Sequence, residues 1–285
     1  MRVTRRQALA AAVVGGALVR GRDAAAGSDR VVKNGRLKQS VSRWPYKDIP
    51  FPEFARACAD MGLTAIDLLE EADWPVVRHY GLTCSMGYAG GGSIPDGLNV
   101  RANHDALVRH FQETIPHAAA QHVANVITFF GNRRGMRDAE AIANCVEGLN
   151  RVKKFGEDHG VTICVELLNS KVNHLDYQGD RTAFGVEVIK AVASPRVKLL
   201  YDIYHMQIME GDVIRTIRDN RQYIAHFHTG GVPGRHELDD TQEINWKAVC
   251  RAIVDTGFTG FVAHEFVPTR DPLTSLREAV TLCDV

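Results

Sequence analysis

Four successive apolar segments of the chain each deliver an acidic or imidazole side chain near their carboxyl end. These side chains are Glu166, Asp202, His228 and Glu265. Three carboxylates held together repel one another and raise one another's pKa unless a cation neutralises them. Three oxygen donors and one imidazole suit Mn²⁺ or Mg²⁺; Co²⁺ is also compatible with them, and Zn²⁺ fits less well. The residue types therefore predict a divalent metal site, and this chemistry needs no organic cofactor.

Neighbouring polar residues each have two readings. Asp202 alone could cap a helix, but among the other acids it is expected to bind the metal. His226 and His228 share strand parity; His228 lies nearer the strand end and is expected to be the ligand, while His226 orients it or packs. His205 follows Asp202 by three residues and is expected to hydrogen-bond the substrate. Arg235, in the turn-rich loop after His228, is expected to clamp a substrate carboxylate or hydroxyl.

From residue 37 onward, short apolar runs alternate with longer segments of helical periodicity. The expected strands are residues 37–44, 65–70, 82–89, 123–131, 162–169, 197–205, 224–230 and 261–268. The expected helices are residues 51–61, 74–80, 103–122, 138–159, 182–193, 212–220, 246–256 and 272–283. Strand-then-helix units without a break in composition predict one α/β domain, a (β/α)8 TIM barrel. Because chemistry in such a barrel occurs at the carboxyl ends of the strands, the four side chains are expected to converge.

Overall charge and cysteine spacing argue against several classes of protein. Lys and Arg number 34, and so do Asp and Glu, so the formal net charge is zero. No overall positive field exists to attract nucleic acid or anionic lipid. The six cysteines include no C-x-x-C pair, and no functional cysteine is expected. We therefore expect a small-molecule substrate, no nucleic-acid partner and no stable insertion in a membrane.

The first 27 residues have the pattern of a twin-arginine export signal. Arg5 and Arg6 precede an apolar stretch at residues 8–19 that is too short for a permanent membrane helix. Three alanines at 24–26 offer a cleavage site. Residues 1–27 are thus expected to be the signal and residues 28–285 an exported, periplasmic catalytic domain. The alternative is a disordered tail in which the paired arginines have no role.

The run HFHTGGVPGRHELDD, with YDIYHMQIMEGD before it and HEF after it, resembles the hydroxypyruvate isomerase family within the xylose isomerase-like TIM barrels. The resemblance covers residues 37 to 284. It implies that Glu166, Asp202, the residue at 228 and Glu265 bind the metal, and that Glu166 and Glu265 form the acid/base pair. Hydroxypyruvate isomerases typically carry Gln at 228, whereas related ketose 3-epimerases carry His, as here. Members are often dimers or tetramers, so a homo-oligomer is compatible with the resemblance.

The expected reaction is isomerisation of a small hydroxy-carbonyl compound, first of all hydroxypyruvate to tartronate semialdehyde, by proton transfer through a metal-stabilised enediolate. A ketose 3-epimerase, or a lyase or hydratase of a 3-keto sugar, would use the same metal and base. A zinc phosphodiesterase acting on abasic DNA would need more metal ligands and a basic groove. A non-catalytic, exported sugar-binding protein would keep the barrel for recognition only, and the paired glutamates weigh against it.

Overall fold

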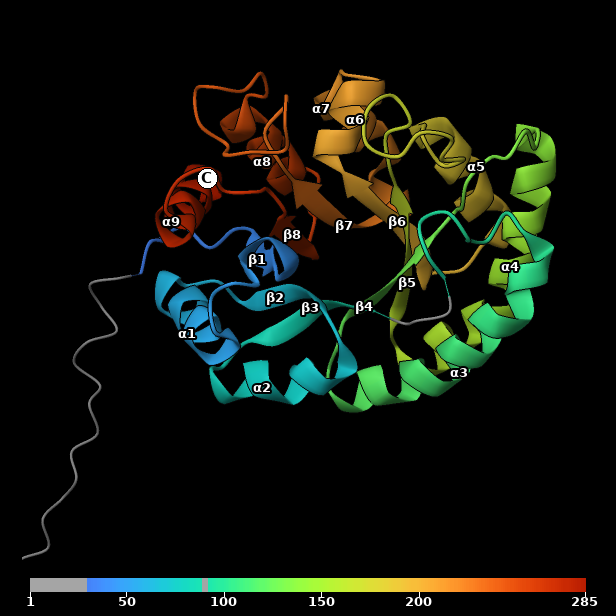
Figure 1. Ribbon diagram of the computed structural model, residues 1–285, viewed down its shortest axis with the longest axis horizontal. Helices are drawn as coiled ribbons and strands as arrows, with labels where there is room; N and C mark the ends of the chain where they lie inside the picture. The colour runs from blue at the N-terminus through green and yellow to red at the C-terminus, as the bar shows by residue number, and fades with distance from the viewer. Residues whose placement is uncertain (1–29, 89–91) are drawn as a thin grey trace, which may run out of the picture.

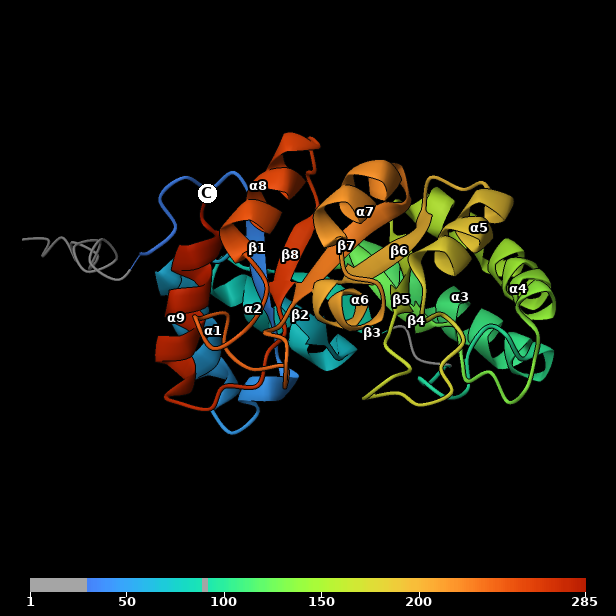
Figure 2. The same ribbon diagram turned by 90° about the horizontal axis from the view of Figure 1, so that it is seen from above.

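Eight parallel strands close into a barrel, with the helices around its outside (Figure 1). The structure is a computed structural model that describes residues 30–88 and 92–285. The strands follow one another around the barrel in chain order, and β1 pairs with β8 to close it (Figure 2). The predicted (β/α)8 TIM barrel is confirmed. The predicted export signal, residues 1–27, lies outside the described residues.

All the predicted strands form, most of them shorter than the apolar runs that predicted them. They are β1 (Lys38–Ser42), β2 (Ala65–Leu69), β3 (Thr83–Tyr88), β4 (Asn125–Phe129), β5 (Thr162–Leu167), β6 (Val197–Asp202), β7 (Ile224–Thr229) and β8 (Phe261–His264). The polar residues that follow a strand end are therefore free to turn into the mouth of the barrel.

The predicted helices also form, with one helix in addition. The α-helices are α1 (Phe51–Met61), α2 (Trp74–His79), α3 (His104–Ala120), α4 (Asp138–His159), α5 (Thr182–Val192), α6 (Ile203–Met209), α7 (Val213–Asn220), α8 (Trp246–Asp255) and α9 (Pro272–Cys283). Short 3-10 turns are η1 (Trp44–Tyr46), η2 (Glu71–Asp73), η3 (Arg101–Asn103) and η4 (Arg221–Tyr223). No helix in the described part of the chain is long and apolar enough to cross a bilayer.

Strand alternation separates two apolar cores. Ile163 and Val165 of β5 point outward into the large core between the barrel and its helices. Inside the barrel a smaller cluster consists of Leu68, Met86, Ile127, Cys164 and Leu200. Since side chains two residues apart share a face, Glu166 lies above Cys164 and Asp202 lies above Leu200, both facing the barrel interior.

The predicted strand at 197–205 was too long. The structure ends β6 at Asp202 and begins α6 at Ile203. Asp202 has extended backbone angles, and its Oδ1 accepts a hydrogen bond from the backbone N–H of His205 at 3.1 Å, a helix N-cap. The strand predicted at 261–268 likewise ends at His264, so Glu265 is the first residue beyond it. Apolar composition continued past the real strand ends because α6 and the residues after β8 are also buried.

Candidate active site

The four side chains named from the sequence converge at one end of the barrel. One ligand atom from each of Glu166, Asp202, His228 and Glu265 lies within 4.8 Å of every other, and all four residues are buried. His228 Nδ1 is 2.5 Å from Glu265 Oε2, 3.4 Å from Glu166 Oε1 and 3.9 Å from Asp202 Oδ2. These residues, from β5, β6 and β7 and from just past β8, are called the four-residue cluster below.

Asp202 caps α6 and also faces the other acids of the site. Its Oδ1 accepts the cap hydrogen bond, and its Oδ2 points to the other members of the four-residue cluster. The cap fixes the rotamer of the side chain and so holds the second oxygen in place. The cap and the predicted role as a ligand are therefore compatible in one carboxylate, because the strand ends where the helix begins.

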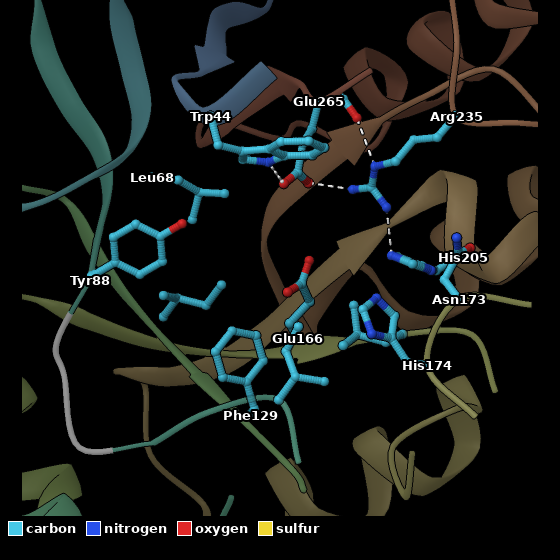
Figure 3. A pocket seen from close by; sticks show the side chains of 13 residues that line it. Trp44, Leu68, Tyr88, Phe129, Glu166, Asn173, His174, His205, Arg235 and Glu265 are labelled. Carbon is cyan, nitrogen blue, oxygen red and sulfur yellow. Dashed lines mark hydrogen bonds and ion pairs between the residues drawn. The ribbon is translucent and has the colours of Figure 1, made fainter. Parts of the chain in front are cut away.

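Arg235 inserts its guanidinium among the carboxylates. Nη2 donates to Asp202 Oδ2 at 2.7 Å. Nη2 also donates to Glu265 Oε2 at 2.6 Å, and Nε donates to the backbone carbonyl of Glu265 at 2.9 Å (Figure 3). Burial alone would lower the pKa of Arg235, but Asp202 and Glu265 outweigh burial and raise the pKa. Arg235, which was expected to clamp the substrate, thus lies at the site and contacts the acids themselves; its role toward a substrate stays a prediction.

The two glutamates have opposite pKa shifts. Burial raises the pKa of Glu166. Burial would also raise the pKa of Glu265, but the positive charges of His228 and Arg235 lower it instead. Trp44 Nε1 adds a hydrogen bond of 2.6 Å to Glu265 Oε1 (Figure 3). Two carboxyl groups whose pKa values are moved apart are typical of an acid/base pair.

Three observations show that a divalent cation fits the four-residue cluster. Its donor atoms lie close enough to share one ion. His228 Nδ1 is buried among the carboxylates and has no hydrogen bond of acceptable geometry among the described residues, so a cation could take the place of its proton. The guanidinium of Arg235 already occupies a place between two acids where positive charge is required. Oxygen-rich ligation with one imidazole matches Mn²⁺ or Mg²⁺.

His205 presents an N–H to the cavity. The backbone N–H of Asn169 donates to His205 Nδ1 at 3.1 Å, and the Asn169 side-chain amide lies 2.6 Å from the same nitrogen. Nδ1 therefore accepts, and the ring proton lies on Nε2. Burial and the nearby Arg235 hold the pKa of His205 well below its ordinary value, so the ring stays neutral. Arg235 Nη1, 2.6 Å from Nε2, places two donors face to face, a contact that a substrate oxygen would improve.

A second layer lies beneath the four-residue cluster, and sequence reasoning missed its centre. Asp67 of β2 is buried, with Oδ2 2.9 Å from His228 Nε2 and Oδ1 3.1 Å from His226 Nε2. Ser85 donates to the same Oδ1 at 2.5 Å. A carboxylate in the middle of the apolar strand AIDLL was the available signal, because a buried charge requires a partner. His226 thus stands in the supporting layer, as one of its two readings expected.

His264 points away from the four-residue cluster. Its ring lies 3.1 Å from Thr229 Oγ1 and 2.9 Å from Gln39 Oε1, and burial lowers its pKa to about 3. It is therefore a neutral histidine of the barrel wall.

A cavity of about 340 Å³ opens beside the four-residue cluster. His174, His205 and Arg235 lie on one side, Leu68, Tyr88 and Phe129 lie on another, and Glu166 and Glu265 project between them (Figure 3). His205 and Arg235, the expected substrate-binding residues, both line it. Trp44, Tyr88, Asn173 and His174 were not foreseen, because they lie at strand ends and in loops without a distinctive spacing.

Comparison with curated proteins gives relatives that include isomerases and epimerases. The chain is 26% identical over 239 residues to the 2-oxo-tetronate isomerase of Pectobacterium atrosepticum, a match that covers 78% of this chain and 88% of that protein. It is 35% identical over 132 residues to the D-psicose 3-epimerase of Agrobacterium fabrum, covering 45% of this chain and 43% of that one. It is 28% identical over 138 residues to a putative hydroxypyruvate isomerase of Homo sapiens, covering 48% and 50%.

Comparison with solved structures gives the same fold. AP endonuclease family 2 from Brucella melitensis superposes with a TM-score of 0.76 at 21% identity, over 84% of this chain and 97% of that one. At that identity the likeness shows the barrel alone. The curated relatives are named isomerases and epimerases, and the chain is accordingly an enzyme of the isomerase class. Residues 24–283 match the family described as xylose isomerase-like TIM barrel, and the chain belongs to that family.

Proposed function

We propose that the chain is a metal-dependent isomerase or epimerase that moves a proton on a carbon beside a carbonyl group of a sugar-like hydroxy-carbonyl compound. The observation that carries this proposal is the convergence of Glu166, Asp202, His228 and Glu265 beside a cavity of about 340 Å³. The relatives named as isomerases and epimerases of 2-oxo-tetronate and psicose support the same class of reaction.

Glu166 and Glu265 are the proposed acid/base pair. They project into the cavity from β5 and from beyond β8, so a substrate between them meets a carboxyl group from each side (Figure 3). One glutamate takes the proton from the carbon, and the other delivers a proton to the product position. Each such general acid or base contributes about 10²–10⁴-fold to the rate. The neutral His205, with its proton on Nε2, donates a hydrogen bond to a substrate oxygen.

The metal site is proposed to use Glu166, Asp202, His228 and Glu265, with Mn²⁺ or Mg²⁺ as the preferred ion. When bound there, a divalent cation supplies Lewis-acid stabilisation of the negative charge that develops on the substrate oxygens, worth several kcal/mol. Asp202 and His228 are held from behind, by the α6 cap and by Asp67, so they fix the site while the glutamates exchange protons.

Two reactions are the main candidates. Conversion of hydroxypyruvate to tartronate semialdehyde is favoured by the resemblance of the VPGR loop and the strand-six motif to hydroxypyruvate isomerases. Epimerisation of a ketose at carbon 3 is favoured by His228, which stands where those isomerases typically carry Gln. Lyase or hydratase action on a 3-keto sugar would begin with the same proton removal, whereas an exported sugar-binding protein would bind without exchange.

A test of the reaction class starts with metal analysis of the purified protein. NMR in D₂O then shows whether candidate hydroxy-carbonyl compounds gain deuterium, and at which carbon. We expect Glu265→Gln to keep the fold and most of the metal affinity while it lowers exchange at least about 10²-fold. Glu113→Gln on the exposed face of α3 is the matched control. Full activity in Glu265→Gln would remove the acid/base assignment.

The localisation is also a proposal. Residues 1–27, with paired arginines ahead of an apolar stretch, are proposed to direct the folded enzyme to the periplasm. Fractionation of cells that produce the full chain, compared with an Arg5→Lys/Arg6→Lys variant, tests it. Retention of the variant in the cytoplasm is the expected result, and an unchanged distribution would refute the signal.

A further inference from the structure

The cavity is larger than a three-carbon substrate requires. A water molecule takes up about 30 Å³ of the liquid. Hydroxypyruvate has about seven non-hydrogen atoms, so even if each took the volume of a water it would leave about a third of the 340 Å³ cavity empty. The cavity therefore has room for a compound at least the size of a hexose.

The two halves of the cavity differ in chemistry. Residues from β5 to β8 and their loops bring the polar groups: Glu166, Asn173, His174, His205, Arg235 and Glu265. Residues from β2 to β5 and their loops bring a different set, here called the apolar wall: Leu68, Ile94, Ile127, Phe129 and Leu168. The basic groups all lie on the polar side, so a carboxylate or phosphate has no counter-charge on the apolar wall.

The apolar wall offers little to a chain of hydroxyl groups. Among the described residues that line the cavity, Tyr88 is the one with a hydroxyl, and burial raises the pKa of Tyr88 so that the hydroxyl stays protonated. Each further hydroxyl buried against Ile127 or Phe129 without a partner loses its hydrogen bonds to water. An aromatic or alkyl group, by contrast, gains from leaving water at the same place.

Leu68 belongs to the apolar wall and has a strained backbone conformation. Its φ is 53°, a left-handed conformation that a leucine rarely adopts, and the second of two register shifts between β2 and β3 falls between Asp67 and Leu69, at Leu68 itself. The shift turns Leu68 into the barrel, where it packs with Ile127 and lines the cavity. Strained residues of this kind cluster at ligand-binding sites.

We propose that the natural substrate is a sugar-like hydroxy-carbonyl compound of six or more carbons that carries an apolar substituent, of the kind found in an aryl glycoside of a keto sugar. The carbonyl end lies at the four-residue cluster, and the substituent lies against Leu68, Ile127 and Phe129. The placement of the carbonyl group at the four-residue cluster rests on the proposed function, whereas the placement of the substituent rests on the apolar wall alone.

Binding of unreactive glycosides tests the apolar wall without any turnover. Calorimetry with the metal-loaded full chain compares phenyl β-D-glucopyranoside with methyl β-D-glucopyranoside. We expect the phenyl glycoside to bind at least tenfold more tightly, and Phe129→Ala to lose most of that preference. Val172→Ala, which removes an exposed apolar side chain from the loop after β5, should leave the preference unchanged. Leu168→Ala serves as the second wall variant if Phe129→Ala fails to fold.

The outcomes separate this inference from the proposed function. Equal binding of the two glycosides, no binding of either, or a preference that survives both wall variants overturns the inference. Efficient deuterium exchange on hydroxypyruvate together with equal glycoside binding leaves the reaction intact and removes the apolar substituent. A clear phenyl preference with no deuterium exchange on hydroxypyruvate, on ketoses or on the matching phenyl and methyl 3-keto-glucosides leaves the apolar wall intact and removes the proposed proton transfer.

Discussion

His228 Nε2 lies 2.9 Å from Asp67 Oδ2, while Nδ1 of the same ring faces Glu166, Asp202 and Glu265. Burial would lower the pKa of His228, but carboxylates face both of its nitrogens and raise the pKa well above its ordinary value. A cation bound among Glu166, Asp202 and Glu265 would replace the proton on Nδ1, while Asp67 keeps the other proton on Nε2. Burial would raise the pKa of Asp67, but His226 and His228 hold it well below its ordinary value, so this partner stays ionised.

Asp67→Asn should weaken metal binding. An amide still accepts a hydrogen bond but lacks the charge that makes the imidazole a better ligand, and loss of such a supporting group typically costs about 10–100-fold in metal affinity. Titration with Mn²⁺, monitored by calorimetry or electron paramagnetic resonance, measures the change in metal affinity. Asp219→Asn on exposed α7 is the charge-matched control. An affinity equal to that of the wild type would limit Asp67 to a packing role.

Arg235→Ala should strengthen metal binding while it destabilises the metal-free protein. The guanidinium must leave Asp202 and Glu265 before an ion can take its place, so its removal ends a competition; we expect about a tenfold gain in affinity, about 1.4 kcal/mol. Without it, two buried acids in the metal-free protein lose their partner. The rise in melting temperature on addition of Mn²⁺ should therefore exceed that of the wild type. Arg251→Ala, exposed on α8, is the control; an unchanged or weaker affinity would contradict the competition.

Glu237→Gln should remove a part of the stability that depends on pH. Glu237 accepts hydrogen bonds from the Thr269 backbone and hydroxyl at 2.8 and 2.9 Å and from the Ser275 hydroxyl at 2.9 Å. Burial raises the pKa of Glu237, but these bonds outweigh burial and lower it to about 2. A depressed carboxyl pKa stabilises the fold above the unfolded value near 4.3 and loses that effect as the pH falls towards 2.

The Glu237→Gln variant should accordingly lose about 1–3 kcal/mol of unfolding free energy at pH 7, and the deficit should shrink as the pH falls from 5 towards 3. Urea unfolding at a series of pH values gives both quantities. Glu113→Gln should follow the wild type throughout. A deficit that is the same at every pH would mean that the charge of Glu237 does not carry the effect.

Gly97→Ala should destabilise the loop that supports Phe129. A Cβ at position 97 would lie 2.3 Å from the Phe129 carbonyl oxygen and 2.5 Å from the Gly131 backbone nitrogen, and backbone on both sides cannot move aside cheaply. We expect a loss of about 3 kcal/mol in thermal or chemical unfolding. Gly257→Ala meets no atom within 4 Å but has a φ of +73°, so its cost should stay near 1 kcal/mol. Similar losses of stability in the two variants would show that crowding around the new Cβ does not cause the loss in Gly97→Ala.

Local sequence pattern was enough to predict the barrel and its metal-site candidates. Glu166 and Glu265 stood out because each lies near the carboxyl end of an apolar run, and parallel strands bring such ends together. The end of β6 was misplaced because the apolar pattern continues into α6, whose first turn is buried as well. Asp67 was missed because its partners, His226 and His228, lie about 160 residues later in the chain, and only the closed barrel brings them together. The apolar wall depends on the register shift at Leu68, which no local pattern encodes.

The guanidinium of Arg235 among the acids means that the chain need not wait for an ion in order to fold. Binding of the proposed ion would then be an exchange, in which the guanidinium withdraws from the acids as the ion enters. The withdrawn arginine is released beside the same cavity, where it can meet an incoming ligand. Movement of the Arg235 side chain would thus couple binding of the ion to binding of the substrate.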